Sequence, residues 1–286
     1  MVFWAITPDC SFNPKTLSSA PATDILAETM QRADWTSPSP APSPAPSPAP
    51  SPARPEGPNT EREIFDHILN SIAEQRLAPG TKLTEEALAE IFGVTRARIR
   101  KVLGLLAQRH VVQLEPNRGA FIASPSIAET EAAFAVRRAL EPTVIAAIRS
   151  LDGEMQREAV RRLEAHLAAE VAARQVGDNG RIIRLAGEFH TVLAELSRNP
   201  VLHEILGDLV SRTALGLAAH GTQQDNDCAP EEHIGIVRAI RDGDECAVDL
   251  MLGHLRALSR IVDHRHGDGE TARGHAPAAL ELAGKE

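Results

Sequence analysis

Downstream of a proline-rich stretch, apolar side chains recur with the period of an α-helix, and turn-forming residues interrupt the pattern. Ile64, Ile68 and Ile72 stand four residues apart, so they share one face of a helix. Thr84 and Thr95 are of the type that caps helix N-termini, and each precedes a further segment of helical period. The pattern therefore predicts three consecutive helices, near residues 60–78, 85–92 and 95–108.

Two short apolar runs follow these helices and are separated by residues that favour a tight turn. The runs cover 111–114 and 120–123, and the segment between them contains Pro116, Asn117 and Gly119. Such a turn between two apolar runs predicts a two-stranded β-hairpin. Three helices followed by a hairpin have the order of a winged helix-turn-helix.

Beyond the hairpin the pattern is helical to about residue 265, with no strand-like alternation. Ser126 and Glu129 have the spacing of a capping box, in which each side chain accepts a hydrogen bond from the backbone N–H of the other residue. The expected fold is mainly α, with an N-terminal winged helix-turn-helix and a C-terminal antiparallel all-helical bundle. The expected bundle helices lie near 126–150, 152–176, 180–198, 201–220, 230–241 and 244–265.

Composition divides the chain into segments. Residues 36–58 consist largely of Ser, Pro and Ala, a composition that favours an extended polyproline-like spacer. The last residues are rich in Gly and Ala and have few large apolar side chains. We expect a disordered N-terminal extension (1–58), a winged helix-turn-helix domain (59–125), a helical ligand-binding and dimerisation domain (126–265) and a disordered tail (266–286).

Overall composition excludes several classes of protein. Of the 286 residues, 43% are hydrophobic, but no apolar run reaches the length of about 18 residues that a membrane span needs. Three scattered cysteines without a C-x-x-C pair exclude a disulfide scaffold and a cysteine-rich zinc module. They suit a reducing compartment, and we expect a cytoplasmic protein.

Positive charge is concentrated in one part of an acidic chain. The whole chain has a formal net charge of −9, whereas residues 95–118 contain six basic residues and one acidic residue. Phosphate backbones are attracted to such patches. A solvated helix face is the alternative explanation of the charge taken alone.

The third predicted helix presents these charges on one side. At about 100° per residue, Ala97 and Lys101 lie opposite the apolar face, with Arg98 and Arg100 on the flanks. Arginine grips phosphates and guanine edges, and a small residue permits close approach in the major groove. The absence of Tyr and the low aromatic content of 3% argue against a single-strand stacking surface. The expected DNA-binding residues are Thr95, Arg96, Ala97, Arg98, Arg100, Lys101, Arg118 and Gly119.

Among the 11 histidines of the chain, a resemblance to a known family, given below, singles out three that lie on three different predicted helices of the second domain. His190, His233 and His254 each have apolar neighbours in the sequence. Three neutral imidazoles that converge inside a bundle would bind zinc, nickel or a similar divalent ion with open coordination positions. The alternative is three separate histidines, each satisfied in its own surroundings.

The segment Pro79–Ser126 resembles the winged helix of the GntR family of bacterial transcription regulators. The run Thr95-Arg96-Ala97-Arg98-Ile99-Arg100-Lys101-Val102-Leu103 stands where the family has S-R-T-P-V-R-E-A-L. The resemblance implies that Arg96 and Arg100 contact DNA and that Gly119 is the wing glycine. Arg98 and Lys101 depart from the family's Pro and Glu, which makes this helix more basic.

The second domain resembles the FCD-type ligand-binding domain of the fatty-acid-regulator branch of that family, over about 126–262. The segments that carry the resemblance are Val136–Pro142, Gly187–His190 with Asn199-Pro200, and Glu232-His233 with Gly243-Asp244 and His254-Leu255. It implies a bundle around a pocket in which many members hold a divalent metal through one Asp and three His.

The position of the family's Asp ligand, four residues before the first histidine, is Ala186 here. Water, Glu188 or His220 would then complete a metal site, or the pocket would bind its ligand without metal. Arg137 matches the family's pocket arginine and would pair with an effector carboxylate. Glu141, one helical turn away, belongs to the same expected site, and an ion pair within the helix is the alternative for these two residues.

The resemblance implies a ligand-responsive transcriptional regulator of a metabolic operon, most simply a repressor. Its expected partners are an operator in double-stranded DNA, a small organic acid or related metabolite bound by Arg137, Glu141 and the three histidines, and a second copy of the chain. We expect no enzymatic activity. The alternatives are a metal-dependent hydrolase with Glu188 as general base, and a module whose winged helix binds protein.

Overall fold

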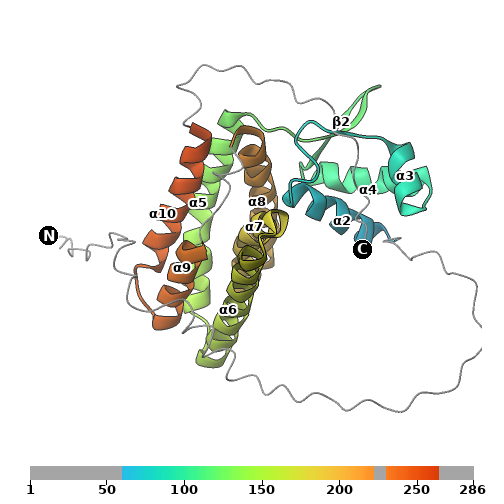
Figure 1. The fold of residues 1–286 in the computed structure, drawn as a ribbon. Coiled ribbons are helices and arrows are strands. Elements are labelled where there is room, and N and C mark those ends of the chain that lie inside the picture. The colour runs from blue at the N-terminus through green and yellow to red at the C-terminus, as the bar shows by residue number, and fades with distance from the viewer. Residues whose placement is uncertain (1–59, 222–229, 264–286) are drawn as a thin grey trace, which may run out of the picture. The chain divides into compact units, whose positions relative to one another are not determined.

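The computed structural model of this protein describes residues 60–221 and 230–263, which form helices and one small sheet (Figure 1). The extension expected over 1–58 and the tail expected over 266–286 lie outside the described residues. Within the two described ranges, no helix combines the length and apolar character required to cross a membrane.

The three predicted helices are present, and the second and third begin directly after their predicted caps, Thr84 and Thr95. The first ends about five residues before the predicted residue 78. Helix α2 spans Glu61–Ala73, α3 spans Glu85–Phe92 and α4 spans Arg96–Gln108. The hydroxyl oxygens of Thr84 and Thr95 accept hydrogen bonds from backbone N–H groups in the first turns of α3 and α4. The apolar faces of the three helices pack into one core, to which α4 contributes Ile99, Val102, Leu103 and Leu106.

The wing is a three-stranded antiparallel sheet: the predicted two-stranded hairpin is confirmed, and a third strand that the sequence analysis missed extends it. Strands β2 (Val112–Glu115) and β3 (Gly119–Ile122) form the predicted hairpin, and β1 (Lys82–Leu83) pairs with the other edge of β3. In this register Leu83 lies opposite Ala120. A two-residue strand is too short to show alternation in the sequence, and only its long-range partner reveals it.

Six helices form the second part of the described chain, and their bounds differ from the predicted ones by at most three residues. They are α5 (Ile127–Arg149), α6 (Gly153–Val176), α7 (Asn179–Leu196), α8 (Pro200–His220), α9 (Pro230–Asp242) and α10 (Ala247–Asp263). The predicted capping box at the start of α5 is present, with Ser126 and Glu129 bonded in both directions.

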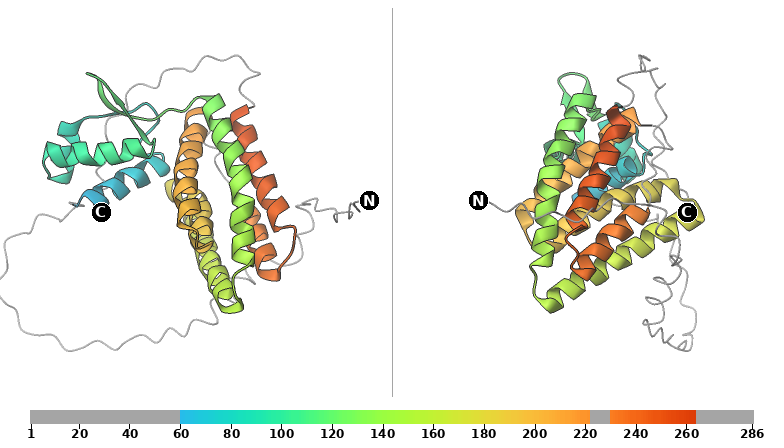
Figure 2. Two further views of the ribbon diagram at one scale, coloured as in Figure 1. Left: turned by 180° about the vertical axis from the view of Figure 1, so that it is seen from behind. Right: turned by 90° about the vertical axis from the view of Figure 1, so that its left-hand side faces the viewer.

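These six helices close into a ring. Along the ring, α5 contacts α8, α8 contacts α7, α7 contacts α6, α6 contacts α9, α9 contacts α10, and α10 returns to α5. Figures 1 and 2 show α10 beside α5 from both sides. The expected mainly α fold, with a winged helix-turn-helix and a helical bundle, is confirmed.

The interior of the ring is apolar with a polar centre. Phe134, Phe189 and Leu255 belong to one cluster of buried apolar side chains drawn from the bundle. Buried polar groups are costly unless they find partners, so polar side chains inside such a core mark a site. The fully or nearly buried polar residues here include Arg137, Glu141, Glu170, His190, Thr213, His233 and His254.

Candidate nucleic-acid interface and candidate metal centre

The structure places the eight predicted DNA-binding residues at the surface. Thr95, Arg96, Ala97, Arg98, Arg100 and Lys101 are exposed on α4 or at its N-cap, and Arg118 and Gly119 are exposed in the wing. The opposite face of α4 is buried in the core. The basic side of α4 is therefore available to a nucleic acid, as the helical wheel predicts.

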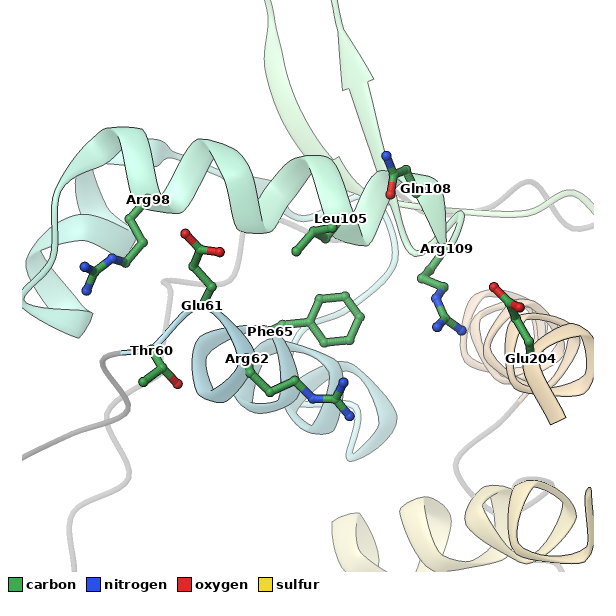
Figure 3. A pocket seen from close by; sticks show the side chains of 9 residues that line it. All are labelled: Thr60, Glu61, Arg62, Phe65, Arg98, Leu105, Gln108, Arg109 and Glu204. Carbon is green, nitrogen blue, oxygen red and sulfur yellow. The ribbon is translucent and has the colours of Figure 1, made fainter. Parts of the chain in front are cut away.

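The flank of α4 that carries Arg98 faces α2. A groove of about 830 Å³ lies on this side, lined by Arg98 and Leu105 of α4 and by Arg62 and Phe65 of α2, among others. Figure 3 shows Arg98 and Glu61 on the two helices that border this groove. Arg98 thus belongs to the edge of the basic face that lies nearest to α2.

The tip of the wing adopts the backbone conformation that its sequence suggests. Asn117 and Gly119 have φ values of 61° and 104°, in the left-handed region that Gly and Asn tolerate best. The guanidinium of Arg118 lies 5.3 Å from the centre of the Phe121 ring. The ammonium of Lys82 in β1 lies 5.8 Å from the same ring, so the wing presents two cations over one aromatic face, with Arg118 beside a residue that has no side chain.

Four of these predicted DNA-binding cations have acidic partners within the molecule. The pairs are Arg96 with Glu86, Arg100 with Glu85, Lys101 with Glu61, and Arg118 with Glu115. Only Glu115 lies within the basic segment 95–118, and the other three acids come from α2 and α3. The fold therefore supplies negative charge that the local sequence does not show.

The three predicted histidines converge at the centre of the bundle. His190 comes from α7, His233 from α9 and His254 from α10, and all three are buried. The Nε2 atom of His254 lies 3.2 Å from Nε2 of His190 and 3.4 Å from Nε2 of His233. Their ligand atoms all lie within 4.8 Å of one another, so the structure brings together the residues that the sequence singled out.

Each histidine is held from behind by a glutamate. Nδ1 lies 2.7 Å from Glu141 in the case of His190, 3.0 Å from Glu170 for His233, and 2.6 Å from Glu232 for His254. An ionised carboxylate only accepts hydrogen bonds, so each Nδ1 donates its proton to the glutamate. In the neutral rings this places the Nε2 lone pair toward the centre, which is the tautomer that metal-binding histidines use.

Arg137 and Glu141 form a buried ion pair within α5 and also belong to the site. Nε of Arg137 donates to Glu141 over 2.7 Å, and Nη1 donates to the hydroxyl of Thr213 over 2.8 Å. Nη2 is buried and has no hydrogen-bond partner among the described residues. Because an orphaned guanidinium nitrogen is costly, it marks a position for an acceptor from a ligand or water.

A small cavity adjoins this arginine. It has a volume of about 60 Å³ and is lined by Arg137, Ala186, His190, Thr213 and His254, among others. Glu141 does not line it, and its two oxygens are bonded to Arg137 and His190. Of the five expected ligand-binding residues, Arg137, His190 and His254 therefore line the cavity, whereas His233 does not, and Glu141 bonds to Arg137 and His190.

The protonation states of the buried residues at this centre favour binding of a cation. Burial, with the charge of Arg137, lowers the pKa of His190 to about 3, against the opposing effect of Glu141. Burial also lowers the pKa of His254. Burial opposes ionisation of Glu141, but the charge of Arg137 and the hydrogen bonds from His190 and Arg137 lower its pKa to about 2. These two histidines are thus neutral and Glu141 is ionised at neutral pH.

The geometry fits a divalent metal ion. Two nitrogens at 2.0–2.1 Å from a tetrahedral zinc ion would lie roughly 3.3 Å apart, close to the observed separations of 3.2 and 3.4 Å. The three glutamates carry more negative charge than the buried guanidinium of Arg137 neutralises. The remaining negative charge would balance the positive charge of a divalent cation. The donor set and its hydrogen-bonded support both suit zinc or nickel.

Neither side chain suggested as a fourth ligand reaches the centre. Glu188 is half-buried and lies 2.5 Å from Nη1 of Arg184, and His220 lies 2.7 Å from the carbonyl oxygen of Pro125. Neither residue belongs to the group of described side chains whose ligand atoms lie within 4.8 Å of one another. Ala186 lines the cavity instead, so the side of the centre where the family has its Asp is open.

Several residues of the site were missed by the sequence reasoning. Glu170, Glu232 and Thr213 support the histidines or Arg137 from α6, α9 and α8. Glu232 is adjacent to His233 in the sequence, which offered a weak signal. Glu170 and Thr213 stand far from their partners along the chain, and no local pattern distinguishes them.

Comparisons with known proteins agree with this two-part arrangement. Residues 60–122 match the family described as bacterial regulatory proteins, gntR family, and residues 132–257 match the FCD domain. The transcriptional repressor RspR of Escherichia coli K12 is 24% identical over 206 residues, which cover 70% of this chain and 88% of the relative. The transcriptional repressor NanR of Enterobacter sp. strain 638 is 28% identical over 224 residues, covering 72% and 86%.

Solved structures show the same fold. A transcriptional regulator GntR from Rhodococcus sp. RHA1 superposes with a TM-score of 0.61 at 20% identity and covers 71% of this chain and 97% of its own. McbR/YncC of E. coli gives a TM-score of 0.61 at 18% identity, with 72% and 98% covered.

Proposed function

This chain belongs to the gntR family of bacterial regulatory proteins and carries an FCD domain, and from that premise we propose that it is a ligand-responsive, DNA-binding transcriptional repressor. In this proposal the domain over 59–125 binds an operator and the domain over 126–265 binds a small effector. Relatives named as transcriptional repressors support the proposal.

The observation that carries the DNA-binding proposal is the position of the basic face of α4. Arg96, Arg100 and Lys101 are exposed on one side of a helix whose other side is locked into a three-helix core. Such a helix enters the major groove as a rigid unit, and the wing can reach a neighbouring groove or phosphate. We assign DNA contact to Thr95, Arg96, Ala97, Arg98, Arg100, Lys101, Arg118 and Gly119.

The first test is the salt dependence of binding. We expect the full-length protein to bind a duplex from the upstream region of its own gene, with log K falling linearly in log salt by about 0.9 for each phosphate contacted. Fluorescence anisotropy with labelled duplex measures this, and the single strand of the same sequence is the control. Affinity that ignores salt, or a preference for the single strand, would contradict the assignment and favour a protein-binding module.

We propose that the bundle centre holds one divalent metal ion through His190, His233 and His254. The bound ion would supply a Lewis-acidic centre with open coordination positions on the side of Ala186. Arg137 lines the adjoining cavity, its buried Nη2 has no hydrogen-bond partner among the described residues, and it would receive an anionic group of the effector. A small organic acid has the chemistry that both features recognise.

The metal site predicts a clear stoichiometry. We expect elemental analysis to find about one zinc or nickel ion per chain, and none after His190→Ala combined with His233→Ala. DNA binding should persist in the double variant, because the basic face lies on α4. His203→Ala, which removes an exposed histidine of α8, is the matched control and should leave the metal content unchanged.

Ala186→Asp tests the open side of the same centre. A fourth protein ligand should raise metal affinity at least tenfold, measured by competition with a chelator of known affinity. Absence of metal from wild-type protein loaded with an excess of zinc or nickel would remove the metal proposal and leave the regulator proposal standing.

We further propose that two copies of the chain act together. A dimer would place two copies of α4 about one turn of DNA apart on an operator of two-fold symmetry. Light scattering after size-exclusion chromatography should give twice the mass of one chain. Effector binding would change the relative placement of the two winged helices, a coupling of about 1–3 kcal/mol in typical allosteric proteins.

The hydrolase alternative has no support in the described part of the chain. Its candidate general base, Glu188, is bonded to Arg184 and is not part of the histidine cluster. Metal-assisted hydrolysis requires a base beside the metal-bound water.

A further inference from the structure

The basic face of α4 is bordered on both flanks by carboxylates from other helices. On the α3 side, Arg100 meets Glu85 and Arg96 meets Glu86. On the α2 side, Lys101 meets Glu61 over 2.6 Å. The charge that DNA would meet is therefore much smaller than the sequence of α4 suggests.

These acids are where helix physics favours them. Glu61 lies in the first turn of α2, and Glu85 and Glu86 lie in the first turn of α3. Negative side chains are stabilising at helix N-termini because of the helix dipole. The fold then directs these two N-termini toward opposite flanks of α4, which brings the acids to the cations.

The contact between Arg100 and Glu85 occupies a specific edge of the guanidinium. Nε lies 2.8 Å from Oε1, and Nη2 lies 2.7 Å from Oε2. This parallel pair of bonds is the geometry that arginine uses for a phosphate or a guanine edge. Arg100 cannot offer that edge to DNA while it holds Glu85.

We propose that Glu61, Glu85 and Glu86 compete with DNA for Lys101, Arg100 and Arg96, and so hold the DNA affinity of this protein below the value its basic helix would give. This inference rests on the proposed DNA-binding function. Each phosphate contact then replaces an internal ion pair, and the displaced carboxylate remains near the negatively charged backbone.

Exposure favours competition over a positioning role for the acids on α3. The side chains of Arg96 and Glu86 are 59% and 76% exposed, so their contact does not fix either of them. The side chains of Arg100 and Glu85 are 71% and 32% exposed, so the arginine in particular is free to move into solvent. The hydrogen bond from Arg100 lowers the pKa of Glu85, which keeps this carboxylate charged. In a contact that holds a side chain rigidly, both partners would be buried, as Glu141 and His190 are.

The test uses the full chain, and its substitutions each remove one negative charge from α3. For Glu85→Gln with Glu86→Gln we expect the affinity for a 20-base-pair duplex of arbitrary sequence to rise about fivefold. The salt dependence should also steepen, by up to about 0.9 for each cation released. Glu90→Gln is the matched control, because Glu90 is exposed on the same helix and has no ion pair among the described residues.

A double-mutant cycle makes the test specific to the pair. The gain from Glu85→Gln should disappear in an Arg100→Ala background, because the cation it releases is gone. Glu61→Gln provides a second, independent variant on the α2 flank and should also raise affinity. Equal unfolding temperatures across the set would show that the fold is retained.

The outcomes separate this inference from the function it rests on. Binding by the wild type with no gain in the glutamate variants, or an equal gain in Glu90→Gln, would overturn the competition. A loss of operator affinity in Glu85→Gln would show instead that Glu85 positions Arg100. Absence of duplex binding by every variant at low salt would overturn the DNA-binding proposal itself.

Discussion

Replacing Arg100 with Ala is expected to lower operator affinity about 10- to 100-fold, the usual range for one bidentate arginine contact. Arg100 lies in the second turn of α4, where the helix faces outward and an arginine can reach a base edge or a phosphate. The combination with Arg96→Ala should remove specific binding altogether. Fluorescence anisotropy with the operator duplex measures both variants.

The fold should survive the loss of Arg100. Its side chain is 71% exposed and makes no contribution to the core, so we expect the unfolding temperature to stay within about 2 °C of the wild type. Arg76→Ala is the matched control, since Arg76 lies beyond the C-terminal end of α2 and pairs with Glu74. Operator affinity retained within threefold in Arg100→Ala would count against the assignment of α4 as the reading helix.

Replacing Glu141 with Gln is expected to lower the free energy of unfolding by about 3–5 kcal/mol, because removing one partner of a buried ion pair strands the other. Arg137 would keep its charge although its side chain is only 3% exposed. Its one remaining hydrogen-bond partner among the described residues would be the hydroxyl of Thr213. His190 would lose the carboxylate that fixes its ring. Urea unfolding followed by circular dichroism gives the free energy.

Two companion variants isolate the cause. Glu158→Gln, which removes an acid from an ion pair with Arg161 that is 55% exposed on both sides, should change stability by less than about 0.5 kcal/mol. Arg137→Met combined with Glu141→Gln should recover much of the lost stability, since no buried charge is then left unpaired. If the double variant does not regain stability, lost packing rather than an unpaired buried charge explains the lower free energy of unfolding of Glu141→Gln.

The same variant predicts a definite pH dependence. The pKa of Glu141 is lowered from 4.5 to about 2 in the folded protein. A carboxyl with a lowered pKa stabilises the fold above its unfolded pKa, and this contribution is lost as pH falls through the folded pKa. The stability difference between the wild type and Glu141→Gln should therefore be constant near neutral pH and shrink between about pH 4.5 and pH 2.

Much of the fold follows from local sequence. Thr84, Thr95 and Ser126 begin helices because their side chains satisfy the backbone N–H groups of the next turn. Apolar residues at helical spacing then determine which face is buried. These signals act over three or four residues, so the sequence shows them directly. These local signals did not predict strand β1, because its two residues form a strand only by pairing with β3.

The sequence predicted the three candidate ligands of the metal centre, but not the residues that hydrogen-bond to these ligands and to Arg137. His190, His233 and His254 stood out through the family resemblance, and the structure brings them together. Their partners Glu141, Glu170 and Glu232 come from three helices, and Thr213 reaches Arg137 from a fourth. Glu188 and His220, suggested as replacements for the missing Asp, bond to Arg184 and to the carbonyl oxygen of Pro125 and do not belong to the histidine cluster.

By itself the sequence determined the helices, their apolar faces and the basic character of α4, since each depends on neighbours within one or two turns of the chain. Only the tertiary structure decided which carboxylates pair with the cations of α4 and with the buried histidines. Glu85 and Arg100 are 15 residues apart, and His190 and Glu141 are 49 apart, so packing of separate helices creates both contacts. Charge and hydrogen-bond partners depend on distance in space, which a linear pattern of residues does not record.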